Sequence, residues 1–500
     1  MKYKSFFAVL AFFIISCGQN KQGIQVDLGS QYPVSTFVKH PEWSKNSVIY
    51  EVNIRQYSEE GTFNAFAEHL PRLQKLGVDI LWLMPVYPIG ELNMKAGQTV
   101  LVDEIQDPGE RKKYLGSYYS TKDFLKVNPE YGTMKDFRSL VDKIHELGMH
   151  VILDIAVNHT AWDHPWVKAH PEYYTRIDTM NLPWNPEWMQ DHPEYFNRIR
   201  KLQMTYPIEE GETDWWDAAE LNYNNDELRT EMKKIFKYWV SEIGVDGYRC
   251  DVAGRVPCDF WNDVRASLDS IKAVFMLAED EDSTCLLNKA FDMNYAWKFH
   301  HILNDIAKED KTIQDLKNYF YEQDTTYDPD IYRMNFITNH DENSWNGSES
   351  ERMGDAVEVM ALLTFTVPGM PMLYTGQEIG LTKRLKFFEK DPIEWQESSW
   401  ENTYQNFIEL KKANKVLWNG TTGGEMKILK SNSEGIFSFT RTNEEEELLV
   451  ITNLSGMPDS TYLPDRYSIR DYSNVFTKEK VNVDRAIILE PYKYLVLKEQ

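Results

Sequence analysis

The stretch VILDIAV at residues 151–157 decides the fold class, because it has the composition of a strand buried on both faces. A helical pattern over residues 134–147 precedes it and stops at Gly148, a residue type that often ends helices. The same unit occurs earlier, where a helical pattern over residues 63–76 leads into an apolar run at residues 78–85. Buried strands that alternate with helices indicate an α/β fold with a parallel sheet.

Eight such strands are expected, and eight parallel strands that alternate with helices close into a (β/α)8 barrel, also called a TIM barrel. Their predicted ranges are 48–54, 78–85, 151–157, 247–252, 273–279, 291–297, 334–339 and 370–376. Two long connections interrupt the pattern, over residues 91–115 and 160–223. Both leave the C-terminal ends of strands, where barrel active sites are built, so we expect them to be functional.

The barrel is predicted to occupy residues 41–418, with the loop-rich insertion at 160–223 following its third strand. From residue 419 the apolar runs become short and often alternate with polar residues. Such a pattern is typical of antiparallel strands with one solvated face. We therefore expect a small C-terminal antiparallel β domain over residues 419–500.

The first residues have the features of a targeting segment. Lys2 and Lys4 precede an apolar run at residues 6–15, which is too short to span a bilayer and suits the core of a signal peptide. The sequence IISCG at residues 14–18 resembles a bacterial lipobox, in which the chain is cut before the cysteine and that cysteine is lipidated. We expect a signal peptide at residues 1–16.

Cys17 is then the predicted lipidation site, and residues 17–40 are the predicted tether. This places the protein in the bacterial cell envelope, lipid-anchored on the periplasmic face or the cell surface. Because no acidic residues follow Cys17 directly, the periplasmic face is favoured. Contact with a membrane is expected only through this anchor, and an ordinary signal peptide with a chance cysteine is the alternative.

Charge and cysteine content exclude two other classes of protein. The net charge is −24, from 54 basic and 78 acidic side chains, so a nucleic acid would be repelled and no nucleic-acid partner is expected. After Cys17 the cysteines are Cys250, Cys258 and Cys285, an odd number that argues against a disulfide framework. Pairing of Cys258 with Cys285 is left open.

Acidic side chains stand at the ends of three predicted strands: Asp251 at the end of the fourth, Glu279 at the end of the fifth and Asp341 just after the seventh. In a barrel these ends meet on one face, and catalytic residues come from several strand ends. Hydrolysis of a glycosidic bond needs one carboxylic acid to protonate the leaving oxygen. It also needs a second, ionised carboxylate on the other side of the sugar.

The neighbours of these acids suggest how the roles divide. Arg249 lies two residues before Asp251, so both point to the same side of a strand, and the guanidinium should hold the pKa of Asp251 down. Glu279 follows an apolar run, so burial should raise its pKa, as a general acid requires. Asp341 adds a negative charge suited to binding sugar hydroxyls or stabilising positive charge on the ring.

These segments resemble the signature regions of the α-amylase family of glycoside hydrolases (family 13), at residues 154–159, 247–251, 279 and 339–341. The resemblance implies that Asp251 is the nucleophile, Glu279 the acid/base and Asp341 the transition-state stabiliser. It also implies four residues that hold the sugar in the cleavage subsite: Tyr119, His159, Arg249 and His340. The insertion at residues 160–223 corresponds to the family's domain B, and the β domain to its domain C.

The resemblance implies no cofactor for the chemistry, and a structural Ca²⁺ ion for which Asn158 matches a family ligand. Two departures concern the subtype. Gly254 and Arg255 stand where α-amylases commonly carry Lys-His, so familiar aglycone-side contacts and one calcium ligand are in doubt. Val252, directly after the predicted nucleophile, is more familiar from α-1,6-glucosidase-like members.

The function expected from these features is a retaining glycoside hydrolase that cleaves α-glucosidic bonds in starch-like glucans or malto-oligosaccharides, in carbohydrate catabolism. The expected partner is therefore an α-glucan or oligosaccharide substrate. Two enzymatic alternatives stay open: an α-glucan transglycosylase, which passes the same covalent intermediate to a sugar, and an α-1,6-acting glucosidase. An inactive glycan-binding scaffold is the non-enzymatic alternative.

Overall fold

The structure is a computed structural model that describes residues 32–97, 100–177, 209–211, 217–468, 470–483 and 486–500. The predicted signal peptide at residues 1–16 and the predicted lipidation site Cys17 lie outside the described residues. One compact unit spans residues 32–500.

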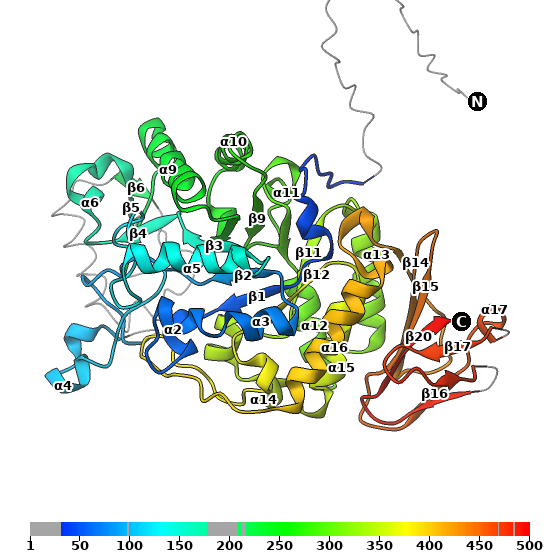
Figure 1. The fold of residues 1–500 in the computed structure, drawn as a ribbon. Helices are drawn as coiled ribbons and strands as arrows, with labels where there is room; N and C mark the ends of the chain where they lie inside the picture. Colours follow the sequence, from blue (N-terminus) through cyan, green and yellow to red (C-terminus); the bar gives the residue numbers. More distant parts are fainter. Residues whose placement is uncertain (1–31, 98–99, 178–208, 212–216, 469, 484–485) are drawn as a thin grey trace, which may run out of the picture. The chain divides into compact units, whose positions relative to one another are not determined.

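The predicted TIM barrel is confirmed (Figure 1): eight strands form a closed barrel in the order β1-β12-β11-β10-β9-β8-β3-β2. All neighbouring strands pair in parallel, with Asp154 opposite Arg249 and Ala156 opposite Asp251 between β3 and β8. The barrel strands are β1 (Ile49–Val52), β2 (Ile80–Leu83), β3 (His150–Ala156), β8 (Gly247–Asp251), β9 (Phe275–Ala278), β10 (Met293–Tyr295), β11 (Tyr332–Asn335) and β12 (Met370–Tyr374).

One barrel strand lies earlier than predicted. We expected the seventh strand at residues 334–339, but β11 ends at Asn335. The apolar run continues because Phe336 and Ile337 are buried in the turn beyond the strand. As a result, residues 339–341 belong to a connecting segment at the mouth of the barrel.

The helices surround the barrel in Figure 1, and α5 shows why they form. It begins at a capping box between Thr133 and Asp136 and buries Phe137, Leu140, Val141 and Ile144 on one face. The main helices are α2 (Phe63–Ala67), α3 (Leu70–Leu76), α5 (Met134–Glu146), α9 (Asp226–Tyr238), α10 (Cys258–Asp269), α11 (Leu286–Lys289), α12 (Trp297–Ala307), α13 (Ile313–Thr326), α14 (Glu349–Met353), α15 (Val357–Thr366) and α16 (Ser399–Ala413).

The helix predicted over residues 63–76 is two helices, α2 and α3. Pro71 lies in the first turn of α3 and has no N–H to donate to the carbonyl of Ala67, so one continuous helix cannot form there. Gly77 ends α3 in the left-handed conformation, at φ 98°, as the sequence indicated.

Inside the barrel, large side chains from several strands form one apolar cluster that includes Trp82, Phe275 and Tyr295. At the start of β8 the packing leaves room only for glycine. A Cβ atom on Gly247 would lie 1.8 Å from the carbonyl oxygen of Phe275 on β9. Gly247 also has φ 155°, in the region that favours glycine. The short residue therefore lets β8 and β9 approach closely just before the catalytic segment.

The two ends of the insertion after β3 pair with each other. Strand β4 (His159–Ala161) pairs antiparallel with β7 (Ala218–Glu220), and β5 (Thr175–Ile177) pairs with β6 (Glu209–Gly211). The β4–β7 pair returns the chain to the end of β3, so these two strands lie at the mouth of the barrel. Residues 178–208 and 212–216 of the insertion lie outside the described residues.

The predicted C-terminal antiparallel domain is confirmed as a six-stranded sheet in the order β13-β14-β15-β20-β17-β18 and a two-stranded sheet β16-β19. Hydrogen bonds from Arg441 to the carbonyl of Thr366 (2.9 Å) and from Tyr494 to Glu358 (2.7 Å) join it to α15. Its strands are β13 (Glu425–Ile428), β14 (Ile436–Thr442), β15 (Glu447–Asn453), β16 (Asp459–Thr461), β17 (Tyr472–Asn474), β18 (Lys480–Val481), β19 (Ile487–Leu489) and β20 (Tyr494–Glu499). We did not predict β16, β17 and β18, which are too short to show an alternating pattern.

Residues 32–40, which we assigned to the tether, pack on the barrel unit instead. The backbone N–H of Val34 donates to the carbonyl of Thr326 (3.0 Å), and that of Phe37 to the carbonyl of Asn288 (2.8 Å). His40 is buried and its Nδ1 lies 2.8 Å from a carboxylate oxygen of Asp292. A sequence without a clear apolar run can be held in place by such backbone contacts, which its composition does not show.

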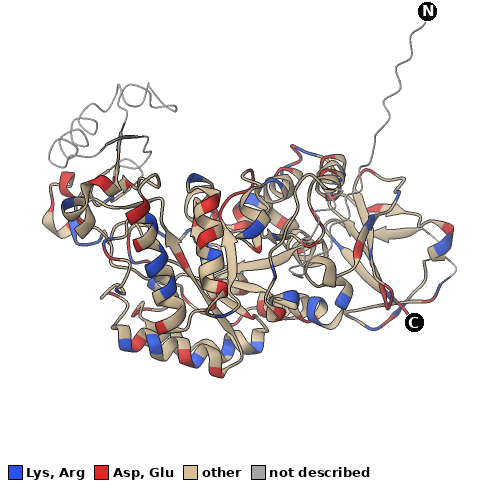
Figure 2. Cartoon of the chain, turned by 90° about the horizontal axis from the view of Figure 1, so that it is seen from above, with Lys and Arg blue, Asp and Glu red and all other residues tan. Residues whose placement is uncertain are grey.

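Three further features complete the fold. Cys258 and Cys285 form a disulfide, whereas Cys250 is buried and free. Figure 2 shows acidic and basic residues interspersed along the outer helices. Within the described ranges, no helix is both long and apolar enough to span a bilayer.

Candidate active site

The three acids predicted from strand ends do meet at the mouth of the barrel. Asp251 is the last residue of β8, and Glu279 follows the last residue of β9. Asp341 stands directly before a short π-helical turn (Glu342–Asn346) that follows β11. Because the strands are parallel and adjacent, their carboxyl ends open on the same side.

Arg249 is the centre of this group. Its side chain is fully buried, and its Nη1 donates to Asp251 Oδ1 at 2.7 Å and to Asp154 Oδ1 at 2.9 Å. Its Nη2 forms an ion pair with Glu279 Oε1 at 2.7 Å, and its Nε donates to the Tyr295 hydroxyl at 3.1 Å. One guanidinium therefore orients the two acids that hydrolysis needs, together with a third.

Because Asp251 and Glu279 contact neighbouring nitrogens of one guanidinium, their carboxyl groups are held close together. A hydrogen bond with Glu279 also lowers the pKa of Asp251, although burial has the larger, opposite effect. The two carboxyl groups that hydrolysis of a glycosidic bond needs therefore share one buried cation.

The environment raises the pKa of Glu279 to about 7, chiefly through burial, with Arg249 opposing and the charges of Asp251 and Asp341 adding to it. This agrees with the expectation for a general acid. For Asp251 the expectation was wrong in sign. Burial raises its pKa by more than the Arg249 guanidinium lowers it, because the carboxyl group is nearly enclosed by the barrel mouth.

His340 is held between three partners. Its Nδ1–H donates to Glu51, its Nε2–H donates to the Tyr119 hydroxyl at 2.8 Å, and Nε2 lies 3.3 Å from Asp341 Oδ2. Burial lowers the pKa of His340, but the charges of Asp341 and Glu51 outweigh it and raise the pKa to about 9. The ring is therefore cationic at neutral pH and can donate from both nitrogens.

Tyr119 and His159 form the other wall. The half-buried Tyr119 stacks on the ring of His340, with centroids 5.5 Å apart, and its hydroxyl donates to Asp154 Oδ2 at 3.1 Å. His159 Nε2–H donates to the backbone carbonyl of Tyr119 at 3.0 Å. Burial lowers the pKa of His159 to about 4, so this ring is neutral. The four residues implied for sugar binding thus line one site with the three acids.

Five residues that we had not assigned also belong to this site. Trp82 donates to Asp154 Oδ2 at 3.1 Å, and Trp345 donates to Asp341 Oδ1 at 3.2 Å, while Glu51 and Tyr295 contact His340 and Arg249. Glu51 and Asp154 had a signal in the sequence, because each is an acid within an apolar strand run. The aromatic residues had none, since most aromatic side chains pack in the core.

The backbone just after Asp251 is strained. Val252 is β-branched yet has φ 37° and ψ 48°, a conformation that such residues rarely adopt and that costs about 1–3 kcal/mol. In this conformation its N–H donates to Glu279 Oε2 at 2.8 Å. The strained conformation of Val252 therefore orients the carboxyl group of Glu279. Gly254 is also closely packed, because a Cβ there would lie 2.0 Å from Asp280 Oδ2, so the Asp280 side chain would have to move to admit a longer residue.

Asn158, the residue that we linked to calcium, is 2% exposed. Neither Oδ1 nor Nδ2 of its amide has a hydrogen-bond partner in the part of the chain that the structure describes. A buried amide oxygen without a donor can be satisfied by a cation, so this residue fits a calcium ligand by one oxygen. No cluster of three His, Cys, Asp or Glu ligands surrounds it within the described residues.

A TIM barrel whose mouth holds two carboxyl groups on one buried arginine has the side chains that a glycoside hydrolase needs. Residues 42–419 match the family model "Alpha amylase, catalytic domain", and residues 436–496 match "Alpha-amylase SusG C-terminal domain". The chain belongs to the α-amylase family and is an α-glucan-active glycosidase.

Similar proteins cover nearly the whole chain. α-Amylase 3 of Dictyoglomus thermophilum is 24% identical over 512 residues, covering 91% of this chain and 94% of the relative. The crystal structure of a maltogenic α-amylase from Thermotoga neapolitana is 26% identical with a TM-score of 0.74, covering 91% of this chain and 99% of that one. An α-amylase from Lactobacillus plantarum is 28% identical with a TM-score of 0.73, with the same coverage.

Proposed function

We propose that this enzyme is a retaining hydrolase of α-glucosidic bonds in starch-like glucans or malto-oligosaccharides. The observation that carries the proposal is the pair of carboxyl groups on Arg249, in which Glu279 has a pKa of about 7 and can hold a proton at neutral pH. Burial raises the pKa of Asp251, and Arg249 opposes this by favouring the ionised form. Acid-assisted nucleophilic attack requires one protonated and one ionised carboxyl group.

In the first step, a carboxylate oxygen of Asp251 attacks the anomeric carbon while the bond from that carbon to the glycosidic oxygen breaks. Glu279 gives its proton to the departing oxygen, so the aglycone leaves as an alcohol and the sugar is bound covalently as an ester. Arg249 neutralises the negative charge of Asp251 before the attack and orients its oxygen.

In the second step, Glu279 is ionised and takes a proton from a water molecule as that water attacks the anomeric carbon. The ester bond to Asp251 breaks, and the carboxylate returns to its original state. Two inversions leave the product with the α configuration of the substrate. Positive charge on the ring in each transition state is stabilised by Asp341, the third carboxylate at the mouth.

The remaining residues are proposed to hold the sugar. His340 is cationic with two N–H groups, and its neighbour Tyr119 presents a ring face for stacking. His159, which is neutral, fixes the backbone of Tyr119 from the other side. Residues on four different segments therefore converge where the reacting ring must lie.

A product time course on amylose, pullulan and isomaltose tests the proposal, with proton NMR of the anomeric configuration in the first minutes. We expect α-configured products, with release from amylose faster than from isomaltose. First-formed products of β configuration would contradict the retaining mechanism. Faster hydrolysis of isomaltose would instead assign the enzyme to α-1,6 bonds.

Transfer to a sugar acceptor is the second candidate, because it uses the same covalent intermediate. A 4-α-glucanotransferase of Thermotoga neapolitana is 26% identical over 376 residues, covering 70% of this chain. Incubation with maltoheptaose, with and without added glucose as acceptor, separates the two. Products longer than maltoheptaose at early times indicate transfer, whereas only shorter products indicate hydrolysis.

We also propose that the mature protein is anchored to the cell envelope by a lipid on Cys17, with the periplasmic face favoured. The basic residues, the short apolar run and the lipobox-like sequence at residues 14–18 support this. Metabolic labelling with a radioactive fatty acid tests it, with Cys17→Ser as the control. Equal labelling of both proteins, or none of the wild type, would contradict the anchor.

A further inference from the structure

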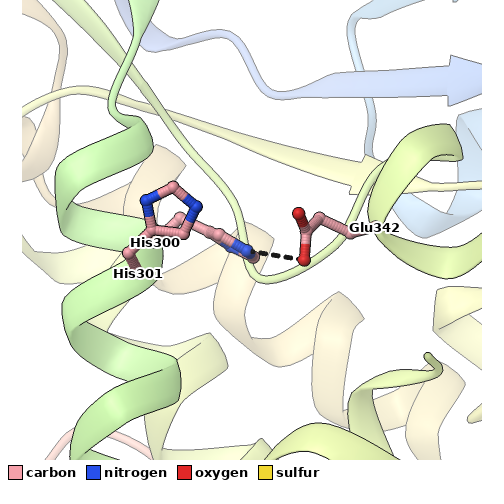
Figure 3. Close-up of side chains that lie close together, drawn as sticks. All are labelled: His300, His301 and Glu342. Carbon is pink, nitrogen blue, oxygen red and sulfur yellow. Dashed lines mark ion pairs between the residues drawn. The ribbon is translucent and has the colours of Figure 1, made fainter. Parts of the chain in front are cut away.

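A second cluster of reactive side chains lies beside the catalytic mouth. His300 and His301 on α12 approach Glu342, the residue that follows Asp341 (Figure 3). One potential ligand atom from each of the three side chains lies within 4.8 Å of the others. None of the three has a role in the mechanism above. Together they carry two imidazoles and one carboxylate, the side chains that zinc uses most often with cysteine.

The hydrogen bonds around His300 determine which of its nitrogens carries hydrogen. Nδ1 lies 3.2 Å from the carbonyl oxygen of Phe336, so it is the N–H donor. Arg352 Nη1 donates to Asn304 Oδ1 at 2.6 Å, which turns the Asn304 amide nitrogen toward His300 Nε2 at 3.1 Å. That amide nitrogen also donates to the backbone carbonyl of His300 at 2.9 Å, so it has a partner other than Nε2. With the hydrogen on Nδ1, a neutral His300 keeps its lone pair on Nε2.

That lone pair also faces Glu342. The distance from His300 Nε2 to Glu342 Oε2 is 3.1 Å, and His300 and Glu342 are both buried. Two acceptor atoms at this separation repel each other unless a cation lies between them. The other carboxylate oxygen, Oε1, accepts from Asn346 at 2.9 Å, so the carboxylate is held in this orientation.

We propose that His300, His301 and Glu342 bind a divalent transition-metal ion, with Zn²⁺ the best match. Tetrahedral Zn²⁺ with ligand distances of about 2.0–2.2 Å keeps its ligand atoms about 3.4 Å apart, close to the Nε2–Oε2 distance observed. The N–H of His300 bonded to a backbone carbonyl is the usual support for a metal-binding imidazole. His301 is exposed, so its ring can close onto the ion and solvent can reach the fourth position.

The site would join α12 to the turn that carries Asp341. The backbone N–H of Glu342 donates to Asn339 Oδ1 at 2.8 Å, so the metal ligand and the residues before Asp341 form one connected segment. The ion would hold this turn in place, and no substrate contact is needed for that role.

Zinc titration of the full mature chain tests the proposal, after chelator treatment and dialysis. Calorimetry is expected to give one strong Zn²⁺ site per chain, and Co²⁺ in its place should show the visible absorption of a tetrahedral complex. His301→Ala and Glu342→Gln should each weaken the affinity by about tenfold or more and abolish the Co²⁺ spectrum. His301 is exposed, so His301→Ala should fold normally, as a melting curve without metal would verify.

His170→Ala is the matched control, because His170 Nδ1 also lies near a carboxylate, at 3.1 Å from Glu172, and among the described residues these two belong to no cluster of three ligands. It should bind Zn²⁺ and Co²⁺ as the wild type does. The proposal is overturned if the wild type binds no Zn²⁺ at micromolar concentrations, since the cation between His300 and Glu342 would then be a proton. It is equally overturned if His301→Ala and Glu342→Gln bind the metal like the wild type.

Discussion

Replacing Glu279 by glutamine removes the proposed acid while changing little else. A glutamine carbonyl can still accept the hydrogen bond that the Val252 N–H donates to Glu279 Oε2 at 2.8 Å. The side chain keeps its length, but the ion pair with Arg249 and the transferable proton are both lost. We therefore expect a folded protein that binds substrate and lacks acid catalysis.

The magnitude follows from the pKa of about 7 for Glu279. In the wild type the protonated fraction falls about tenfold for each pH unit above 7, so kcat/KM on a glucan should fall in the same way. Loss of the general acid should reduce kcat by about 10²–10⁴-fold at the pH optimum. The limb of the profile above pH 7 should disappear in Glu279→Gln, because no proton remains to be lost there.

The assay compares maltotriose with a maltosyl fluoride, whose leaving group needs no protonation. Glu279→Gln should retain nearly full rates of covalent-intermediate formation with the fluoride, measured as the first burst of fluoride release. Glu281→Gln is the matched control, since Glu281 lies two residues further and pairs with Arg333 instead. Equal losses on both substrates, or an alkaline limb that persists in Glu279→Gln, would refute this assignment of the acid.

Three more outcomes follow from the packing and the contacts. Gly247→Ala should lower the free energy of unfolding by about 3 kcal/mol, because its Cβ meets a backbone carbonyl of β9. Gly244→Ala, at φ 92° in open space, should lower it by only about 1–2 kcal/mol. Urea unfolding measures both variants, and equal losses would contradict the clash at Gly247. Trp345→Phe removes the hydrogen bond to Asp341 and should lower kcat on amylose about tenfold, so an unchanged kcat would exclude a positioning role. If Asn158 binds calcium, EDTA should lower the melting temperature of the wild type but not of Asn158→Ala, and equal shifts in both would exclude that ligand.

The barrel was predictable because strands buried on both faces are continuous apolar runs bounded by glycine and proline. The sequence predictions were wrong where the packing of a segment does not follow the pattern of a strand. Phe336 is buried in the turn after β11, so the apolar run there outlasts the strand. Residues 32–40 pack through backbone hydrogen bonds and the buried side chain of His40, neither of which produces an apolar run in the sequence.

By itself the sequence determined the fold class and placed Asp251, Glu279 and Asp341 at one end of the barrel, because strand ends are a local property. Only the tertiary structure decided the electrostatics of the site. The pKa of Asp251 rises although Arg249 stands beside it, since the surrounding strands remove water from both. Burial lowers the pKa of His340, but the charges of its neighbour Asp341 and of Glu51, 289 residues away along the chain, outweigh it and keep the ring cationic. The contact with Glu51 forms only when distant strands close into a barrel.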